Sequence, residues 1–218
     1  MAAALFAVVP ASCGDDDPKA EPPRRAATVV ASLGDSITAG TPLWDPDPAM
    51  REQLPQIDRR SEYGYWAERE RPGTEYRNCG VPGERTDEIA LRVGDCARGA
   101  DALIVQGGVN DLSQGIEPAA VARNLRAMVR RGRQLGLDVA IVEVLPWNGG
   151  YPDYADEVRE LNRRIAGIAH EEGAELIPWY RVLEDPAKPG RMRLDLTVDL
   201  AHPTVKGYRL LGEAVDFP

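Results

Sequence analysis

Along most of the chain, stretches with the hydrophobic spacing of strands alternate with stretches that have the spacing of helices. Short apolar runs rich in β-branched residues predict five strands: Thr28–Leu33, Glu75–Cys79, Ala102–Gln106, Val139–Leu145 and Ala174–Ile177. No internal repeat interrupts this alternation. Strands that alternate with helices form right-handed βαβ crossovers, which place the strands in one parallel sheet with helices on both faces. The pattern therefore predicts an α/β protein, a three-layer α/β/α sandwich.

Helices are predicted where apolar residues recur at i, i+4 and i+7. One such segment is opened by Glu117-Pro118 and closed by Gly136, and a second ends at Gly173. Their apolar stripes are Val121, Leu125 and Met128 in the first helix, and Leu161, Ile165 and Ile168 in the second. Further helices are expected near Tyr63–Arg71 and over Thr204–Val215.

Length and charge narrow the class of protein. The chain has 218 residues, enough for one domain with a full core, and its 43% hydrophobic and 28% charged residues are typical of a globular protein. Its formal net charge of -9 argues against a nucleic-acid partner, which would require a basic surface. We expect a monomer.

The first 27 residues are predicted to be a targeting region that precedes a folded domain at 28–218. Ala2–Ala11 is an apolar run too short to span a bilayer, with the length of a signal-peptide core. It leads to Ser12-Cys13, which resembles a bacterial lipoprotein cleavage site and makes Cys13 a lipidation candidate; an ordinary secretory leader, residues 1–13, is the alternative. Residues 14–27 are charged and proline-rich, which predicts a disordered tether. The protein is therefore expected outside the cytoplasm, secreted or tethered to the membrane through Cys13.

If Cys13 carries a lipid, Cys79 and Cys96 remain as a pair in an oxidising compartment. They are candidates for a disulfide, and two free buried thiols are the alternative. With two histidines and three scattered cysteines, no metal site is predicted. No cofactor is expected.

Four short motifs follow the predicted strands in order. Gly34-Asp35-Ser36 follows the first strand, Gly80-Val81-Pro82-Gly83 the second and Gly108-Val109-Asn110-Asp111 the third, while Asp199-Leu200-Ala201-His202 lies near the C-terminus. In open α/β sheets, ligands bind beyond the carboxyl ends of the strands, where strand order reverses. If the order is 2-1-3-4-5, the residues at positions 36, 80 and 110 emerge at neighbouring strand tips.

These residues can be assigned chemical roles. A serine hydroxyl is a weak nucleophile until a base takes its proton, and His202 is the natural base for Ser36. Asp199, three residues earlier, can hold the other ring nitrogen. The backbone N–H groups of Ser36 and Gly80 and the side-chain amide of Asn110 can stabilise an oxyanion.

This set of residues resembles the SGNH, or GDSL-like, hydrolase family, whose four blocks carry Ser, Gly, Asn and His. Ser36, Gly80, Asn110 and His202 match those blocks and Asp199 matches the triad acid, over about residues 28–217. The resemblance implies a flavodoxin-like sheet, no metal or cofactor, and esterase, lipase or thioesterase activity through an acyl-enzyme.

Each residue also has a purely structural interpretation. Ser36 could cap a helix, Asn110 could be a turn residue, and His202 could lie on the surface before a helix. The stretch Thr41–Arg60, which contains Trp44, is a candidate wall or lid, or else a solvated insertion.

Further predictions concern residues next to the motifs and the second histidine. Trp147 and Asn148, after the fourth strand, are candidates to line the substrate pocket, although Trp147 could equally be a packing residue. Asp35 and Asp111 are expected to brace loops, and His170 to be solvent-exposed.

The leading functional hypothesis is an extracytoplasmic serine hydrolase that cleaves carboxylic esters, either a short-acyl esterase or a lysophospholipase-like enzyme. An acyltransferase that acts on a sugar or lipid alcohol, and a catalytically silent envelope-binding module on the same fold, are the alternatives. The sequence does not identify the ester.

Overall fold

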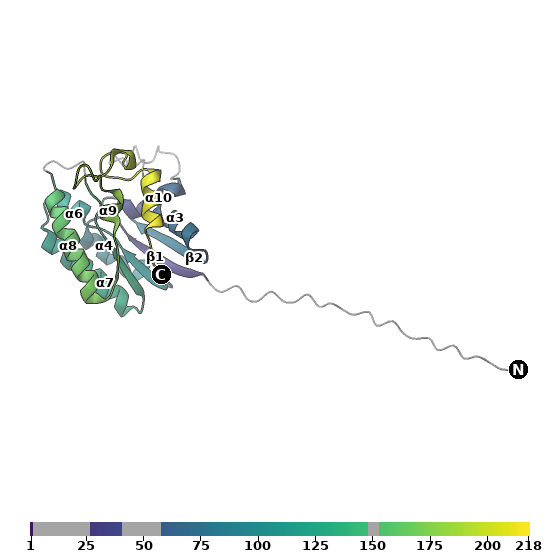
Figure 1. Cartoon of the computed structure of the whole chain (residues 1–218). Helices are drawn as coiled ribbons and strands as arrows, with labels where there is room; N and C mark the ends of the chain where they lie inside the picture. The colour runs from purple at the N-terminus through teal and green to yellow at the C-terminus, as the bar shows by residue number, and fades with distance from the viewer. Residues whose placement is uncertain (2–26, 41–57, 148–152) are drawn as a thin grey trace, which may run out of the picture.

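A computed structural model describes Met1 and residues 27–40, 58–147 and 153–218 (Figure 1). The predictions that concern the leader after Met1, the tether up to residue 26, Cys13, Trp44 and Asn148 lie outside the described residues.

A five-stranded, all-parallel sheet forms the centre of the molecule. Its order is β2-β1-β3-β4-β5, which confirms the predicted order and fold class. The strands are β1 Thr28–Gly34, β2 Thr74–Gly80, β3 Ala102–Val105, β4 Asp138–Val142 and β5 Glu175–Ile177. The three inner strands are almost wholly buried, as expected for a parallel sheet that is covered on both faces.

Successive side chains of the inner strands enter two separate cores. Leu103 and Val105 of β3 pack into one core, whereas Ala102 and Ile104 pack into the other. Figure 1 shows the helices around the sheet, with α7 and α8 on one side and α3 and α10 on the other.

The helices and 3-10 turns occupy the connections between strands. They are α1 Ser36–Ala39, η1 Arg59–Ser61, α3 Tyr63–Glu70, α4 Thr86–Leu91, α5 Val93–Cys96, α6 Val109–Ser113, α7 Pro118–Gln134, α8 Ala155–Glu172, α9 Trp179–Leu183, η2 Leu194–Leu196 and α10 Val205–Glu213. The predicted helices correspond to α3, α7, α8 and α10. The shorter helices were not predicted from the spacing of apolar residues. None of the described helices has the length and apolar character needed to cross a membrane.

The fourth strand is shorter than predicted, and a buried side chain explains why. β4 ends at Val142 instead of Leu145. Beyond it, Asn162 of α8 accepts the N–H of Val144 at 2.8 Å and donates to its carbonyl at 2.9 Å. These two bonds replace the ladder bonds that would otherwise extend the strand, because a buried backbone needs such partners.

The carboxyl end of β2 is tied to the neighbouring layer. Cys79 and Cys96 form a disulfide with a Cα–Cα distance of 6.0 Å. Arg92 donates to the carbonyls of Cys79 (2.7 Å) and Gly34 (3.1 Å), so one guanidinium joins the ends of β1 and β2. The strand tips that carry the first two motifs are therefore cross-linked.

Candidate active site

Ser36 lies in the sharp turn between β1 and α1. Asp35 caps this short helix, because its carboxylate accepts the N–H of Ile37 at 2.9 Å. Ser36 is the first helical residue, so its own N–H has no partner within the helix. Its side chain is only 4% exposed, and it lines a cavity at the carboxyl edge of the sheet.

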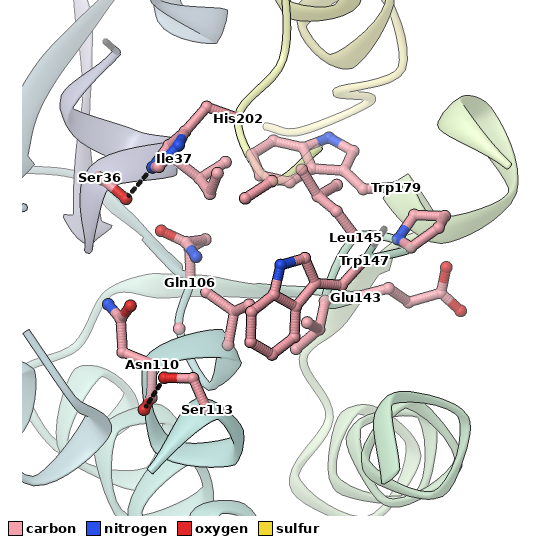
Figure 2. Close-up of a pocket in the computed structure, with 15 residues that line it drawn as sticks. Ser36, Ile37, Gln106, Asn110, Ser113, Glu143, Leu145, Trp147, Trp179 and His202 are labelled. Atoms are coloured by element: carbon pink, nitrogen blue, oxygen red, sulfur yellow. Dashed lines mark hydrogen bonds between the residues drawn. The ribbon is translucent and has the colours of Figure 1, made fainter. Parts of the chain in front are cut away.

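The C-terminal loop brings His202 to this serine. His202 Nε2 lies 2.8 Å from Ser36 Oγ, although 166 positions separate the two residues (Figure 2). Both side chains are buried, which keeps bulk water away from their hydrogen bond. The hydroxyl can therefore pass its proton directly to the imidazole.

Asp199 holds the other side of the imidazole. Its Oδ2 lies 2.6 Å from His202 Nδ1, while its Oδ1 accepts the backbone N–H of His202 at 2.6 Å and of Ala201 at 3.0 Å. Partial burial tends to raise the pKa of Asp199, but the hydrogen bonds from the His202 side chain and backbone outweigh it and lower the pKa to about 2. Asp199 is thus a carboxylate at neutral pH, and it can orient the ring and stabilise the imidazolium.

The loop that carries this pair is a tight turn. Thr197 and Pro203 form an antiparallel bridge at its base, and the N–H of Val198 donates to the carbonyl of His202 at 3.0 Å. Leu200 at its tip has φ 72°, and it is the only non-glycine residue with a positive φ in the part of the chain that the structure describes.

Asn110 faces the same cavity from α6. Its Nδ2 donates to the carbonyl of Glu84 at 2.9 Å, and Ser113 Oγ donates to its backbone carbonyl at 2.8 Å (Figure 2). A primary amide has two N–H donors, so one remains for a substrate oxygen. Asn110 and the Ser36 N–H therefore suit the oxyanion role that was predicted for them.

Gly80 does not suit that role, and this part of the prediction requires correction. Its N–H donates to Asn78 Oδ1 at 2.9 Å, so it is already occupied. A Cβ at Gly80 would lie 2.1 Å from the backbone nitrogen of Ala39, which explains the glycine by the close approach of β2 and α1. In the same turn, Gly83 has φ 83° and an N–H without a hydrogen-bond partner among the described residues. Gly83 is thus the better backbone candidate, one that the sequence analysis missed.

Asp35 is a buried brace, as predicted. Its backbone N–H donates to Gln106 Oε1 at 3.0 Å, and the same oxygen accepts the hydroxyl of Thr38 at 2.9 Å. Burial raises the pKa of Asp35 to about 6, although hydrogen bonds from Ile37 and Gln106 oppose the shift. Gln106, directly after β3, therefore fixes the turn on both sides of Ser36.

Asp111 braces the neighbouring turn in the same way. Its carboxylate is fully buried and accepts the N–H of Thr86 at 2.9 Å and the hydroxyl of Thr86 at 2.6 Å. Burial raises its pKa, and the two bonds from Thr86 oppose that effect. These two bonds between Asp111 and Thr86 hold α6, and therefore Asn110, against α4. Thr86 follows the second motif in the sequence, but no local pattern signals this partnership.

The cavity has a volume of about 190 Å³ and is mostly apolar. Ser36, His202 and Asn110 lie at one end and Trp147 at the other (Figure 2). The other residues that line it are Ile37, Gln106, Gly107, Val109, Ser113, Glu143, Val144, Leu145, Pro146, Trp179 and Ala201.

Of the remaining predicted residues, Trp147 both lines the cavity and stacks on Tyr154, with ring centroids 5.1 Å apart. Trp147 therefore has a packing contact and also faces the cavity, while its contact with substrate stays a prediction. His170 is exposed, as predicted. Within the described residues, no cluster of three or more His, Cys, Asp or Glu side chains is arranged to hold a metal ion.

Comparisons with known proteins agree with this geometry. Residues 32–210 match the model of the GDSL-like Lipase/Acylhydrolase family. No curated protein matches the chain significantly.

Solved structures show the same fold at low sequence identity. A member of the lipolytic protein G-D-S-L family from Veillonella parvula is 20% identical, with a TM-score of 0.69, and the match covers 86% of this chain and 96% of that one. A GDSL-like lipase from Bacteroides thetaiotaomicron is 19% identical, with a TM-score of 0.67 and coverage of 90% and 89%. A variant of an acetyl-xylooligosaccharide esterase from Geobacillus is 18% identical, with a TM-score of 0.66 and coverage of 88% and 95%.

Proposed function

Because the chain belongs to the GDSL-like lipase/acylhydrolase family and is therefore a carboxylic-ester hydrolase, we propose that it cleaves short-acyl esters through an acyl-enzyme on Ser36. The observation that carries this proposal is the continuous hydrogen-bonded relay from Ser36 Oγ to His202 Nε2 (2.8 Å) and from His202 Nδ1 to Asp199 Oδ2 (2.6 Å).

In the acylation step, Ser36 Oγ attacks the ester carbonyl and its proton passes to His202 Nε2. The carbonyl oxygen becomes an oxyanion, which the Ser36 N–H and Asn110 Nδ2 stabilise. The imidazolium then donates its proton to the ester oxygen, the bond from carbon to that oxygen breaks, and the alcohol leaves. Asp199 stays ionised throughout, because its pKa of about 2 lies far below neutrality.

Deacylation repeats these steps with water. Water attacks the acyl carbon while His202 takes its proton, and the imidazolium then returns a proton to Ser36 Oγ as the carboxylic acid departs. The products are one alcohol and one acid, and the enzyme is restored.

The size and lining of the cavity favour a short acyl group. Its volume of about 190 Å³ is below the roughly 300–1,000 Å³ of sites that hold larger ligands. Apolar side chains, among them Val109, Leu145 and Trp147, line its depth and suit a small alkyl group.

We also propose an extracytoplasmic location. The apolar run Ala2–Ala11, the cysteine at position 13 and a disulfide between Cys79 and Cys96 are all typical of exported proteins. Fractionation of cells that produce the whole chain, with and without Cys13→Ser, would test this. Recovery of the wild-type protein in the cytoplasm with free thiols would contradict it.

The catalytic proposal can be tested with a fluorophosphonate probe and intact-mass analysis. The wild type should gain one adduct, Ser36→Ala should gain none, and Ser113→Ala, which alters another serine of the same cavity, should still be labelled. With nitrophenyl acetate, a burst of nitrophenol equal to the enzyme concentration would reveal the acyl-enzyme. If the folded wild type is not labelled, the proposal fails.

A further inference from the structure

The loop that carries Asp199 and His202 also carries exposed aliphatic side chains. Seven large hydrophobic residues are exposed among those the structure describes, and three of them lie within positions 194–200. These are Leu194 (67% exposed), Val198 (47%) and Leu200 (42%). Val198 and Leu200 flank Asp199 directly, at the tip of the turn that leads to His202.

Neither backbone geometry nor packing explains a leucine at position 200. The turn requires the left-handed conformation there, because Asp199 Oδ1 receives the N–H groups of both Ala201 and His202. Glycine and asparagine adopt this conformation more easily than leucine does. The side chain is also too exposed to belong to the core. A binding role would account for both features.

The proton transfer from His202 to the leaving oxygen indicates which part of the substrate these side chains contact. The imidazolium of His202 must donate its proton to the departing ester oxygen, so that oxygen lies within about 3 Å of Nε2. In the proposed mechanism the acyl group occupies the cavity, which runs from Ser36 past Asn110 toward Trp147 (Figure 2). The alcohol part of the ester therefore leaves the site along the loop of His202. Ala201 already lines the cavity, and the exposed Leu200 precedes it in the sequence.

We infer that Val198 and Leu200 form an apolar subsite for the alcohol part of the substrate, so that the preferred esters combine a short acyl group with an alkyl or aryl alcohol. This inference rests on the proposed ester hydrolysis and specifies the class of its leaving group. Esters of sugars or other polyols would leave the two aliphatic side chains facing hydroxyl groups, without the gain from apolar burial.

Two acetates of nearly equal length test the subsite. In n-pentyl acetate the alcohol chain is wholly alkyl, whereas in 2-ethoxyethyl acetate one methylene is replaced by an ether oxygen. Hydrolysis is followed by acid release at constant pH, with each kcat/KM divided by the rate constant of that ester with hydroxide. We expect the wild type to prefer the pentyl ester by about fourfold or more, since one buried methylene is worth a factor of about four.

Leu200→Asn is the decisive variant, because asparagine tolerates the left-handed conformation but is polar. It should reduce the preference to less than about twofold. Leu135→Asn is the matched control: Leu135 is also exposed (40%), but it follows α7 and precedes β4, at the amino edge of the sheet opposite the site. This variant should retain the wild-type preference.

The outcomes separate the two proposals. If the wild type hydrolyses both acetates at the same normalised rate, or if Leu200→Asn keeps the wild-type preference, the subsite is overturned while ester hydrolysis stands. An equal loss of preference in Leu135→Asn would also overturn the subsite, because the effect would not be local. If neither ester is hydrolysed and Ser36 takes no fluorophosphonate, the proposed function itself has failed.

Discussion

Gln106 Oε1 accepts the backbone N–H of Asp35 at 3.0 Å, so the end of β3 fixes the residue that precedes the nucleophile. The same oxygen accepts the hydroxyl of Thr38 at 2.9 Å. A Cβ at Gly34 would lie 2.3 Å from this oxygen, which explains why the nucleophile turn begins with glycine. The position of Ser36 therefore depends on a side chain from a different strand.

Replacing Gln106 with leucine should lower both stability and kcat. The buried N–H of Asp35 would lose its acceptor, which costs about 1–3 kcal/mol of unfolding free energy. Because the turn could then shift, kcat should fall by about tenfold or more, as expected when reacting groups are misplaced. Denaturant unfolding and steady-state kinetics measure the two effects. Gln114→Leu, at an exposed position, should change neither, and a Gln106→Leu enzyme with wild-type kcat would contradict the positioning role.

Replacing Asn110 with alanine should lower kcat by about 10²–10³-fold, the usual loss for one oxyanion donor. KM should change much less, because the charge on this oxygen develops only in the transition state. Asn124→Ala is a suitable control, since Asn124 Nδ2 donates to Thr86 Oγ1 (3.0 Å), next to the Thr86–Asp111 pair, without lining the cavity. A loss below threefold in Asn110→Ala would remove this residue from the oxyanion site.

Replacing Asp199 with asparagine should lower kcat by about 10²–10⁴-fold, because the amide no longer fixes the required tautomer of His202. The exposed part of this side chain allows water to compensate in part, which favours the lower end of that range. Asp195→Asn, in the same region but paired with Lys206, should retain activity. Kinetics at pH 8 compare the three proteins, and equal rates in all of them would exclude Asp199 from the mechanism.

The sheet and the meeting of Ser36, His202 and Asp199 could be predicted because their signals are local. The buried run of β1, the Gly-Asp-Ser turn and the Asp-His spacing each occupy a few adjacent positions. The bracing roles of Asp35 and Asp111 were expected, but their partners Gln106 and Thr86 could not be predicted, because each lies far away or in another motif of the sequence. Gly80 shows the same limit, since only the structure reveals that its N–H is taken by Asn78 and that Ala39 excludes a side chain there.

The buried carboxyl of Asp35 should make stability depend on pH. Its pKa is about 6 in the folded protein and 3.8 without burial, so between these values the unfolded chain loses its proton first. Unfolding free energy should therefore fall by about 2 kcal/mol as the pH rises from 4 to 6 and by about 3 kcal/mol over the whole titration, and this contribution is constant above about pH 7.

Asp35→Asn provides the test, because its amide oxygen can still accept the N–H of Ile37. This variant should lose the decline between pH 4 and 6 and be the more stable protein at pH 7, as measured by denaturant unfolding at several pH values. Asp58→Asn, which alters an exposed carboxyl, should keep the wild-type slope. Parallel curves for the wild type and Asp35→Asn would show that Asp35 has no raised pKa.

Leu200 should be a position where glycine increases stability. Its φ of 72° costs a non-glycine residue about 1–2 kcal/mol, whereas the extra flexibility of glycine in the unfolded chain costs about 0.5–1 kcal/mol. Leu200→Gly should therefore raise the unfolding free energy by about 0.5–1 kcal/mol. Val198→Gly, two positions earlier and without a positive φ, should lower it, because the entropic cost of glycine applies there with no relief of backbone strain and the valine, 47% exposed, also loses apolar contacts. Thermal and denaturant unfolding of both variants give the comparison. If Leu200→Gly is as destabilising as Val198→Gly, the leucine is not strained, and its conformation offers no argument for a binding role.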